Sequence, residues 1–108
     1  MAKAASKRAP FPRTSDYTRT FRKDFERLSR SGRYDMHRLK QAMLLLIAND
    51  APLGPEWLDH PLKGEYSGHR ECHVGGDFLL IYEVDDKGGK SGSIVFERTG
   101  THAELFNE

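Results

Sequence analysis

The sequence predicts a small α+β domain in which two helices pack on one face of a mostly antiparallel β-sheet. Its length of 108 residues suits one domain, at roughly 100 to 200 residues per domain. Helical spacing of apolar residues is confined to the first half of the chain, and strand patterns, apart from one short segment, are confined to the second. The expected order is β-α-α-β-β-β with a C-terminal turn or short helix.

Residues 1–13 are expected to form a flexible basic arm, and residues 14–108 a single folded domain. The arm is rich in alanine, lysine, arginine and proline and has no apolar periodicity. A short strand is expected over residues 13–17, which overlaps this boundary by one residue.

The first helix begins after Thr18, a residue type that caps helices, and its apolar positions Phe21, Phe25 and Leu28 share one face. Gly32 ends it. A second helix begins near Asp35, with an apolar stripe formed by Met36, Leu39, Met43, Leu46 and Ile47.

Two prolines and a glycine between residues 51 and 55 exclude further helix. We expect Trp57 and Leu58, which follow this loop, to dock on the core. Residues 69–74 then alternate, so that Glu71 and His73 point to one face and Cys72 to the other.

A two-residue turn at Gly75-Gly76 is expected to lead into a central strand, because residues 78–84 form a continuous apolar run. After a glycine-rich connection over residues 85–92, a last strand is expected over 93–99. Gly100 is expected to break it, and residues 102–106 to form the final turn or helix.

Composition excludes several classes of protein. With 37% hydrophobic and 31% charged residues, the chain is neither disordered nor a membrane protein, and no apolar run approaches the ~20 residues that span a bilayer. One cysteine permits no internal disulfide and no cysteine metal cluster. We therefore expect a cytoplasmic protein without membrane contact.

The net charge of +1 conceals an uneven distribution. Residues 1–40 hold 12 lysines and arginines against 4 acidic residues, whereas residues 41–108 hold 5 against 12. A basic front half is compatible with binding to nucleic acid or another anionic partner, although solvated helix surfaces often carry such charges.

Four of the five histidines lie in the strand-forming half, at His60, His69, His73 and His102, and Asp77 follows His73 closely. Neither HExxH nor His-x-His occurs, so the spacing does not indicate a metal site. The absence of a G-x-S-x-G motif and of phosphate-binding glycine loops disfavours nucleophilic hydrolysis and nucleotide chemistry. Histidines, an aspartate and an arginine can instead perform acid–base chemistry on a phosphodiester without a cofactor.

Four motifs are recognisable together: H-P-L-K-G at residues 60–64, G-H-R-E-C-H-V at 68–74, D-F-L-L-I-Y at 77–82 and F-E-R-T-G-T-H-A-E-L-F at 96–106. They resemble the YafQ-type toxins of the RelE/ParE superfamily, over about residues 14–106. The resemblance implies a ribosome-dependent mRNA endonuclease, the toxin of a type II toxin–antitoxin pair. Its partners would be a cognate antitoxin, ribosomal RNA and mRNA, with DNA contacted only through the antitoxin complex.

The family's active-site positions fall on His60, His73, Asp77, His102 and Phe106. Among these positions we expect His60 and His102 to be the proton-transfer pair. His73 and Asp77 would position the scissile phosphate or tune the other groups, and Phe106 would stack on or brace a base. Further RNA-binding candidates are Lys63, Arg70, Phe78 and Arg98, although Phe78 also begins the apolar run and Arg98 shares strand parity with core residues. Candidate ribosome contacts on the first helix are Arg19, Arg22, Lys23, Arg27 and Arg30.

Two alternatives remain at the level of sequence. A ParE-like toxin would share the fold and bind gyrase without catalysis, and an inactive domain would only bind a partner. The three matched histidines and the aspartate favour the nuclease, since gyrase binding does not require them.

Overall fold

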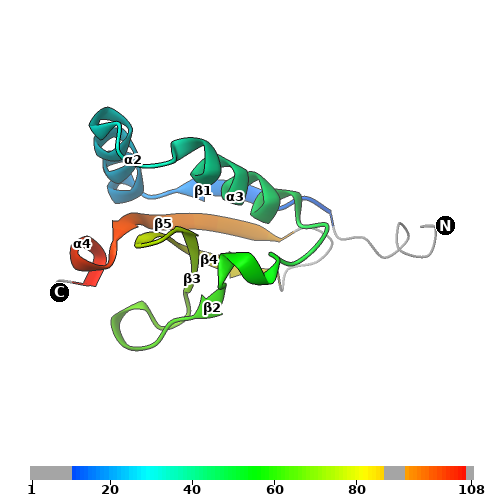
Figure 1. Cartoon of the computed structure of the whole chain (residues 1–108). Helices are drawn as coiled ribbons and strands as arrows, with labels where there is room; N and C mark the ends of the chain where they lie inside the picture. Colours follow the sequence, from blue (N-terminus) through cyan, green and yellow to red (C-terminus); the bar gives the residue numbers. More distant parts are fainter. Residues whose placement is uncertain (1–10, 87–91, 107–108) are drawn as a thin grey trace.

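Five strands form one open sheet in the computed structural model, which describes residues 11–86 and 92–106 (Figure 1). Their spatial order is β1 (Thr14–Tyr17), β5 (Ser93–Thr101), β4 (Phe78–Asp85), β3 (Arg70–Gly75) and β2 (His60–Pro61). β1 runs parallel to β5, and the other neighbours are antiparallel. The predicted α+β class is confirmed.

Both predicted helices are present and lie side by side over one face of the sheet, as α2 (Arg19–Ser31) and α3 (Met36–Ala48) (Figure 1). Thr18 caps α2 by accepting a hydrogen bond from a backbone N–H of its first turn, and Asp35 caps α3 in the same way. Gly32 ends α2 in the left-handed conformation, with φ of 70°.

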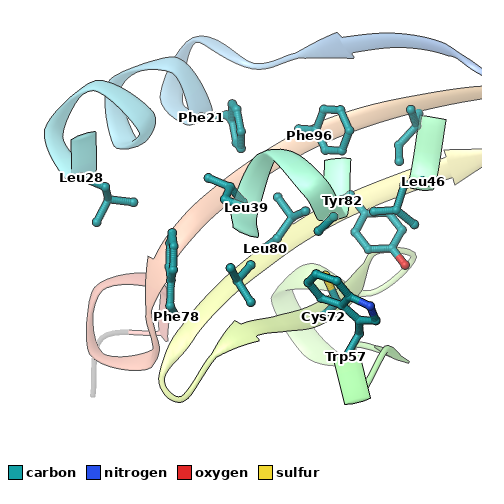
Figure 2. Packing of buried hydrophobic residues seen from close by; sticks show 13 residues of the cluster. Phe21, Leu28, Leu39, Leu46, Trp57, Cys72, Phe78, Leu80, Tyr82 and Phe96 are labelled. Atoms are coloured by element: carbon teal, nitrogen blue, oxygen red, sulfur yellow. The ribbon is translucent and has the colours of Figure 1, made fainter. Parts of the chain in front are cut away.

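The sheet has a core on each face because alternate residues of β4 point in opposite directions. The helix-side core fills the space between the helices and the sheet (Figure 2) and includes Phe21, Leu28, Leu39, Leu46, Trp57, Cys72, Phe78, Leu80, Tyr82 and Phe96. On the other face, here called the open face, a smaller cluster contains Leu79, Ile81 and Leu105, with Leu62, Tyr66 and Phe106 packed against it.

The turn between β3 and β4 differs from the predicted Gly75-Gly76 turn. Gly75 still belongs to β3 and pairs with Phe78, and the register shifts between His73 and Gly75. Gly76, with φ of 50°, and Asp77 therefore form the turn. This shift moves Asp77 to the tip of the hairpin.

The predicted break at Gly100 is also wrong, since β5 continues to Thr101 and Gly100 pairs with Leu79. Gly100 has φ of 154°, and a Cβ atom there would lie 2.6 Å from Glu104 Oε1. Its positive φ favours glycine at this position, where the chain passes into α4 (His102–Phe106), the short helix that ends the described chain.

Trp57 docks on the core as expected, but Leu58 does not. Trp57 ends the short 3₁₀ helix η1 (Pro55–Trp57) beneath the Arg38 guanidinium, whereas Leu58 is 59% exposed. Leu58 adopts a left-handed conformation, with φ of 48°, and this turns the chain directly after η1.

The expected arm lies outside the described residues up to position 10, as does most of the expected connection, at 87–91. The described body already includes Arg13, whose backbone N–H donates to the Ile47 carbonyl and whose guanidinium pairs with Asp86 at 2.9 Å. No helix within the described ranges is long and apolar enough to cross a membrane.

Candidate active site

Three histidines that are distant in the sequence meet on the open face. His60 comes from β2, His73 from β3, and His102 is the first residue of α4. The ring centroids of His60 and His73 are 6.1 Å apart, and those of His73 and His102 are 6.2 Å apart. Pairing of the short strand β2 with β3 is what brings His60 into this group, because His60 lies opposite Glu71 in the register.

Asp77 orients the third of these histidines. Its Oδ1 lies 2.7 Å from His102 Nδ1 and also accepts a hydrogen bond from the His102 backbone N–H at 3.1 Å. These hydrogen bonds hold the pKa of Asp77 below its usual value. Asp77 follows His73 closely in the sequence, but the shifted turn places its carboxylate against His102.

A buried carboxylate lies between the other two histidines. Glu71 Oε1 is 3.3 Å from His60 Nε2 and 3.5 Å from His73 Nε2, and the Glu71 side chain is only 2% exposed. Its second oxygen, Oε2, is buried and has no hydrogen-bond partner within the described part of the chain. A buried carboxylate with one unpaired oxygen lowers the stability of the fold. Such groups are unusual outside functional sites.

The same three side chains form a candidate cation site. His60, Glu71 and His73 each offer one ligand atom, and these atoms lie within 4.8 Å of one another. Imidazole nitrogen and carboxylate oxygen are ligands that zinc and other transition metals accept. The unpartnered Glu71 oxygen suits this arrangement, so the residues present fit a metal ion.

Phe106 lies one helical turn after His102, with a ring-centroid separation of 5.7 Å. It contacts Tyr66 as well, at 5.7 Å and in an edge-on arrangement. α4 therefore presents an imidazole and an aromatic ring side by side on the open face.

Arg98 is fixed by a buried partner on α2. Its Nε and Nη2 atoms donate to the Asp24 carboxylate at 2.8 and 3.1 Å, and Asp24 also accepts from the Thr99 backbone N–H. The hydrogen bonds that Arg98 donates to Asp24 keep its pKa above the usual value, and the nearby Tyr66 side chain acts in the same direction. Arg98 thus combines a structural contact with a fixed positive charge beside Tyr66.

A family model described as "Bacterial toxin of type II toxin-antitoxin system, YafQ" matches residues 13–107. The chain belongs to the YafQ toxin family. The mRNA interferase toxin YafQ of Escherichia coli K12 is 44% identical over 94 residues, which cover 87% of this chain and 96% of the relative.

Solved structures agree with membership of the YafQ family. The E. coli DinJ–YafQ complex contains a chain that is 44% identical, with a TM-score of 0.74 over 87% of this chain and 98% of that one. A metal-bound toxin from Helicobacter pylori is 36% identical, with a TM-score of 0.71 over 86% and 98% of the two chains. A YoeB/ParE toxin from Agrobacterium tumefaciens, 17% identical over 82% and 98%, shares the fold with a TM-score of 0.66.

The structure brings together all five residues on which the YafQ resemblance placed the active site. They form a continuous series of ring contacts and hydrogen bonds on the open face: His60, His73, Asp77, His102 and Phe106.

The weaker RNA-binding candidates are dispersed. Phe78 is 5% exposed in the helix-side core, where its ring lies 5.1 Å from that of Tyr34, so it is not available to RNA. Arg70 pairs with Asp59 and lines a separate cavity of about 540 Å³, on the strand face opposite His73. Lys63 is exposed, two residues after the end of β2.

The basic residues of α2 differ in their contacts. Arg22 pairs with Glu26, and Arg27 bridges Asp24 and Glu104, which ties α2 to α4. Arg19, Lys23 and Arg30 are exposed, and they remain candidates for contact with the ribosome.

Sequence reasoning missed Glu71, Asp24 and Tyr66 as parts of the site. Strand alternation did place Glu71 on the face of His73, but its second partner, His60, comes from a strand of two residues that shows no periodicity. In the sequence, Asp24 is indistinguishable from the other polar residues of an amphipathic helix, and only its contact with Arg98 in the structure shows its role.

Proposed function

We propose that this YafQ-family chain cuts mRNA on the translating ribosome, by acid–base catalysis that needs no metal. The family to which it belongs is one of type II toxins, and its curated relatives in E. coli are named mRNA interferases. The observation that carries the proposal is the row of three histidines on the open face, with His102 held by Asp77 at 2.7 Å.

The reaction needs two proton transfers. One imidazole takes the proton of a ribose 2′-hydroxyl, and the 2′-oxygen then attacks the adjacent phosphorus. The bond between phosphorus and the 5′-oxygen breaks, and a second imidazole gives its proton to that oxygen. The products are a 2′,3′-cyclic phosphate and a 5′-hydroxyl. Imidazoles suit both transfers because their ordinary pKa lies near neutrality, at about 6.5.

His60 and His102 are the proposed proton-transfer pair, with His73 between them. An ionised Asp77 carboxylate accepts hydrogen bonds but cannot donate one. It therefore fixes the proton of neutral His102 on Nδ1 and leaves Nε2 as the reactive atom. The Leu58 carbonyl, 2.9 Å from His60 Nδ1, fixes that ring in the same way.

A cognate antitoxin is the proposed protein partner, as in the E. coli complex of YafQ with DinJ. The activity explains why an antitoxin is needed, because an unrestrained mRNA nuclease would arrest the cell that makes it. The proposed site of action is the cytoplasm, where translating ribosomes are found.

The test is primer extension on a defined mRNA in a purified translation system. Wild-type protein should give codon-registered cuts that require ribosomes, and His102→Ala should abolish them. His37→Ala is the matched control, since His37 is exposed on α3 away from the open face and its loss should leave the cuts unchanged. Cuts that persist in folded His102→Ala protein would remove His102 from the chemistry.

We also propose that a transition-metal ion binds His60, Glu71 and His73 and inhibits cleavage. The three clustered ligand atoms and the unpartnered Glu71 oxygen support this role, and the H. pylori relative was solved in a metal-bound form. A bound ion would occupy the lone pair that His60 needs for proton transfer.

Calorimetric titration with Zn²⁺ or Cu²⁺ tests the metal proposal without an activity assay. Wild-type protein should bind one ion, and Glu71→Gln should bind it at least tenfold more weakly. Loss of even a group that only supports the metal ligands typically lowers metal affinity by that factor. Equal affinity in both proteins would place any bound metal elsewhere.

A further inference from the structure

The row of rings that begins at His60 does not end at Phe106. Beyond Phe106 it continues through Tyr66 to His69, with centroid separations of 5.7 and 5.9 Å. All five successive separations lie between 5.7 and 6.2 Å, which is contact distance for aromatic rings. The complete ring row is His60, His73, His102, Phe106, Tyr66 and His69.

The loop that carries Tyr66 is held in one conformation by its own backbone. Tyr66 ends the 3₁₀ helix η2 (Gly64–Tyr66), and its carbonyl accepts from the His69 N–H at 2.9 Å. Gly64 and Gly68 have φ of 68° and 91°, conformations that disfavour other residues. The ring of Tyr66 is therefore positioned before any ligand arrives, which lowers the entropic cost of binding.

A fixed positive charge accompanies this ring. The Arg98 guanidinium lies near enough to the Tyr66 side chain for Tyr66 to help hold its pKa above the usual value, and two of its nitrogens donate to the Asp24 carboxylate. The Arg98 side chain retains 24% exposure, so it can still meet a solvent-borne anion. An aromatic ring next to an exposed guanidinium matches a nucleotide, which offers a base to stack and a phosphate to neutralise.

We propose that Tyr66 is a base-stacking residue, which with Phe106 and Arg98 binds a nucleotide of single-stranded RNA adjacent to the cleaved bond. This inference rests on the proposed nuclease function and deepens it. Tyr66 is half-buried against the open-face cluster, and the competing interpretation is that it only packs there, as Leu62 does. Stacking on an aromatic ring accepts any base, because every base has a π-face.

Single-turnover cleavage on ribosomes programmed with a short synthetic message tests the proposal. The message carries either a normal base or an abasic nucleotide at each position flanking the cut. Wild-type protein should cleave about 5- to 150-fold more slowly when the base at one of these positions is missing, the factor that corresponds to stacking of one base. Tyr66→Leu should cleave the normal message about that much more slowly and be insensitive to the abasic change.

Two further variants separate stacking from packing. Tyr66→Phe keeps the ring, so it should retain most of the base effect. Leu62→Ala damages the same cluster without removing a ring, so it should lower thermal stability while keeping the full base effect. Melting temperatures of all variants report on folding.

The outcomes are distinguishable. If wild-type protein does not cleave the normal message, the proposed nuclease function fails. If it cleaves normally but is indifferent to an abasic nucleotide at every flanking position, the nuclease stands and the stacking role of Tyr66 is wrong. A full base effect in folded Tyr66→Leu protein would also overturn it.

Discussion

Two carboxylates divide the histidines of the site between them. Asp77 is at the exposed tip of a hairpin and holds His102, whereas Glu71 is buried beneath His60 and His73. The two acids are only six positions apart in sequence, and both lie near His73. Their environments separate their roles. Asp77, exposed to solvent, orients the ring of His102, whereas Glu71 is a buried carboxylate shared by the rings of His60 and His73.

Replacing Asp77 with asparagine should reduce cleavage strongly without unfolding the protein. An amide cannot enforce the same proton position on His102, so we expect a loss on the order of 10²-fold or more in the single-turnover rate. Stability should change little, because the Asp77 side chain is 59% exposed. Urea denaturation and the ribosome cleavage assay measure the two effects.

Asp50→Asn is the matched control for Asp77, because Asp50 is exposed and lies at the separate cavity beside Arg70. It should leave both rate and stability unchanged. An Asp77→Asn protein with wild-type rate would show that His102 does not depend on this contact.

Cys72 should be inert in the folded protein. It is fully buried in the helix-side core, and burial raises the pKa of its thiol to about 12. Because the thiolate is the reactive form, a thiol reagent such as DTNB at pH 8 should label native protein only as fast as the protein unfolds, and label it at once in urea. Rapid labelling of native protein would contradict the described burial.

At the level of elements, one buried carboxylate joins α2 to the sheet. β1 pairs with β5 only as far as Phe96, so the following residues of β5 have no neighbouring strand on that side. Asp24 accepts a hydrogen bond from the backbone N–H of Thr99, which would otherwise be buried without a partner. The same oxygen atoms hold Arg98, and Arg27 continues from Asp24 to Glu104 on α4. Helix α2 therefore supports the elements that carry Arg98, His102 and Phe106.

Asp24→Asn should destabilise the fold by about 3 kcal/mol, because it leaves the guanidinium of Arg98, only 24% exposed, without its counter-charge. Glu26→Gln is the matched control on the same helix. It breaks the exposed pair with Arg22 and should cost less than about 0.5 kcal/mol. Midpoints of urea denaturation at constant m-value measure both changes, and equal shifts would contradict the anchoring role of Asp24.

At the scale of the whole molecule, the uneven charge along the chain places a group of exposed cations on one helix. Helix α2 carries exposed cations over the sheet, while the chain after residue 40 is acidic overall. Binding to the ribosome through phosphate contacts releases counter-ions. The logarithm of the affinity must therefore fall linearly with the logarithm of the salt concentration, with a slope proportional to the number of phosphate contacts.

Combined replacement of Arg19, Lys23 and Arg30 by alanine should weaken ribosome association and flatten its dependence on salt. Each lost phosphate contact should lower the slope of log affinity against log salt by about 0.7 to 0.9. Arg27→Ala should instead lower the melting temperature, because Arg27 is engaged with Asp24 and Glu104. An unchanged salt slope in the triple variant would exclude this face of α2 from the ribosome interface.

The sequence by itself determined most elements and the family. Both helices, their caps, the buried strand over residues 78–84 and the α4 segment follow from spacing within a few residues, and the four motifs by themselves indicate the YafQ toxins. Local patterns suffice for these features because helix periodicity, capping and strand alternation are interactions between near neighbours in the chain.

Only the tertiary structure decided how the groups of the site contact one another, and it alone added Glu71 and Tyr66 to them. The two-residue strand β2 brings His60 to Glu71, a one-residue shift in the hairpin turns Asp77 toward His102, and η2 places Tyr66 beside Phe106. None of these contacts has a signature in the sequence, because each joins short irregular segments whose positions depend on the register of strands elsewhere in the sheet. Such registers are set by burial over the whole fold, and they become known only when the sheet is assembled.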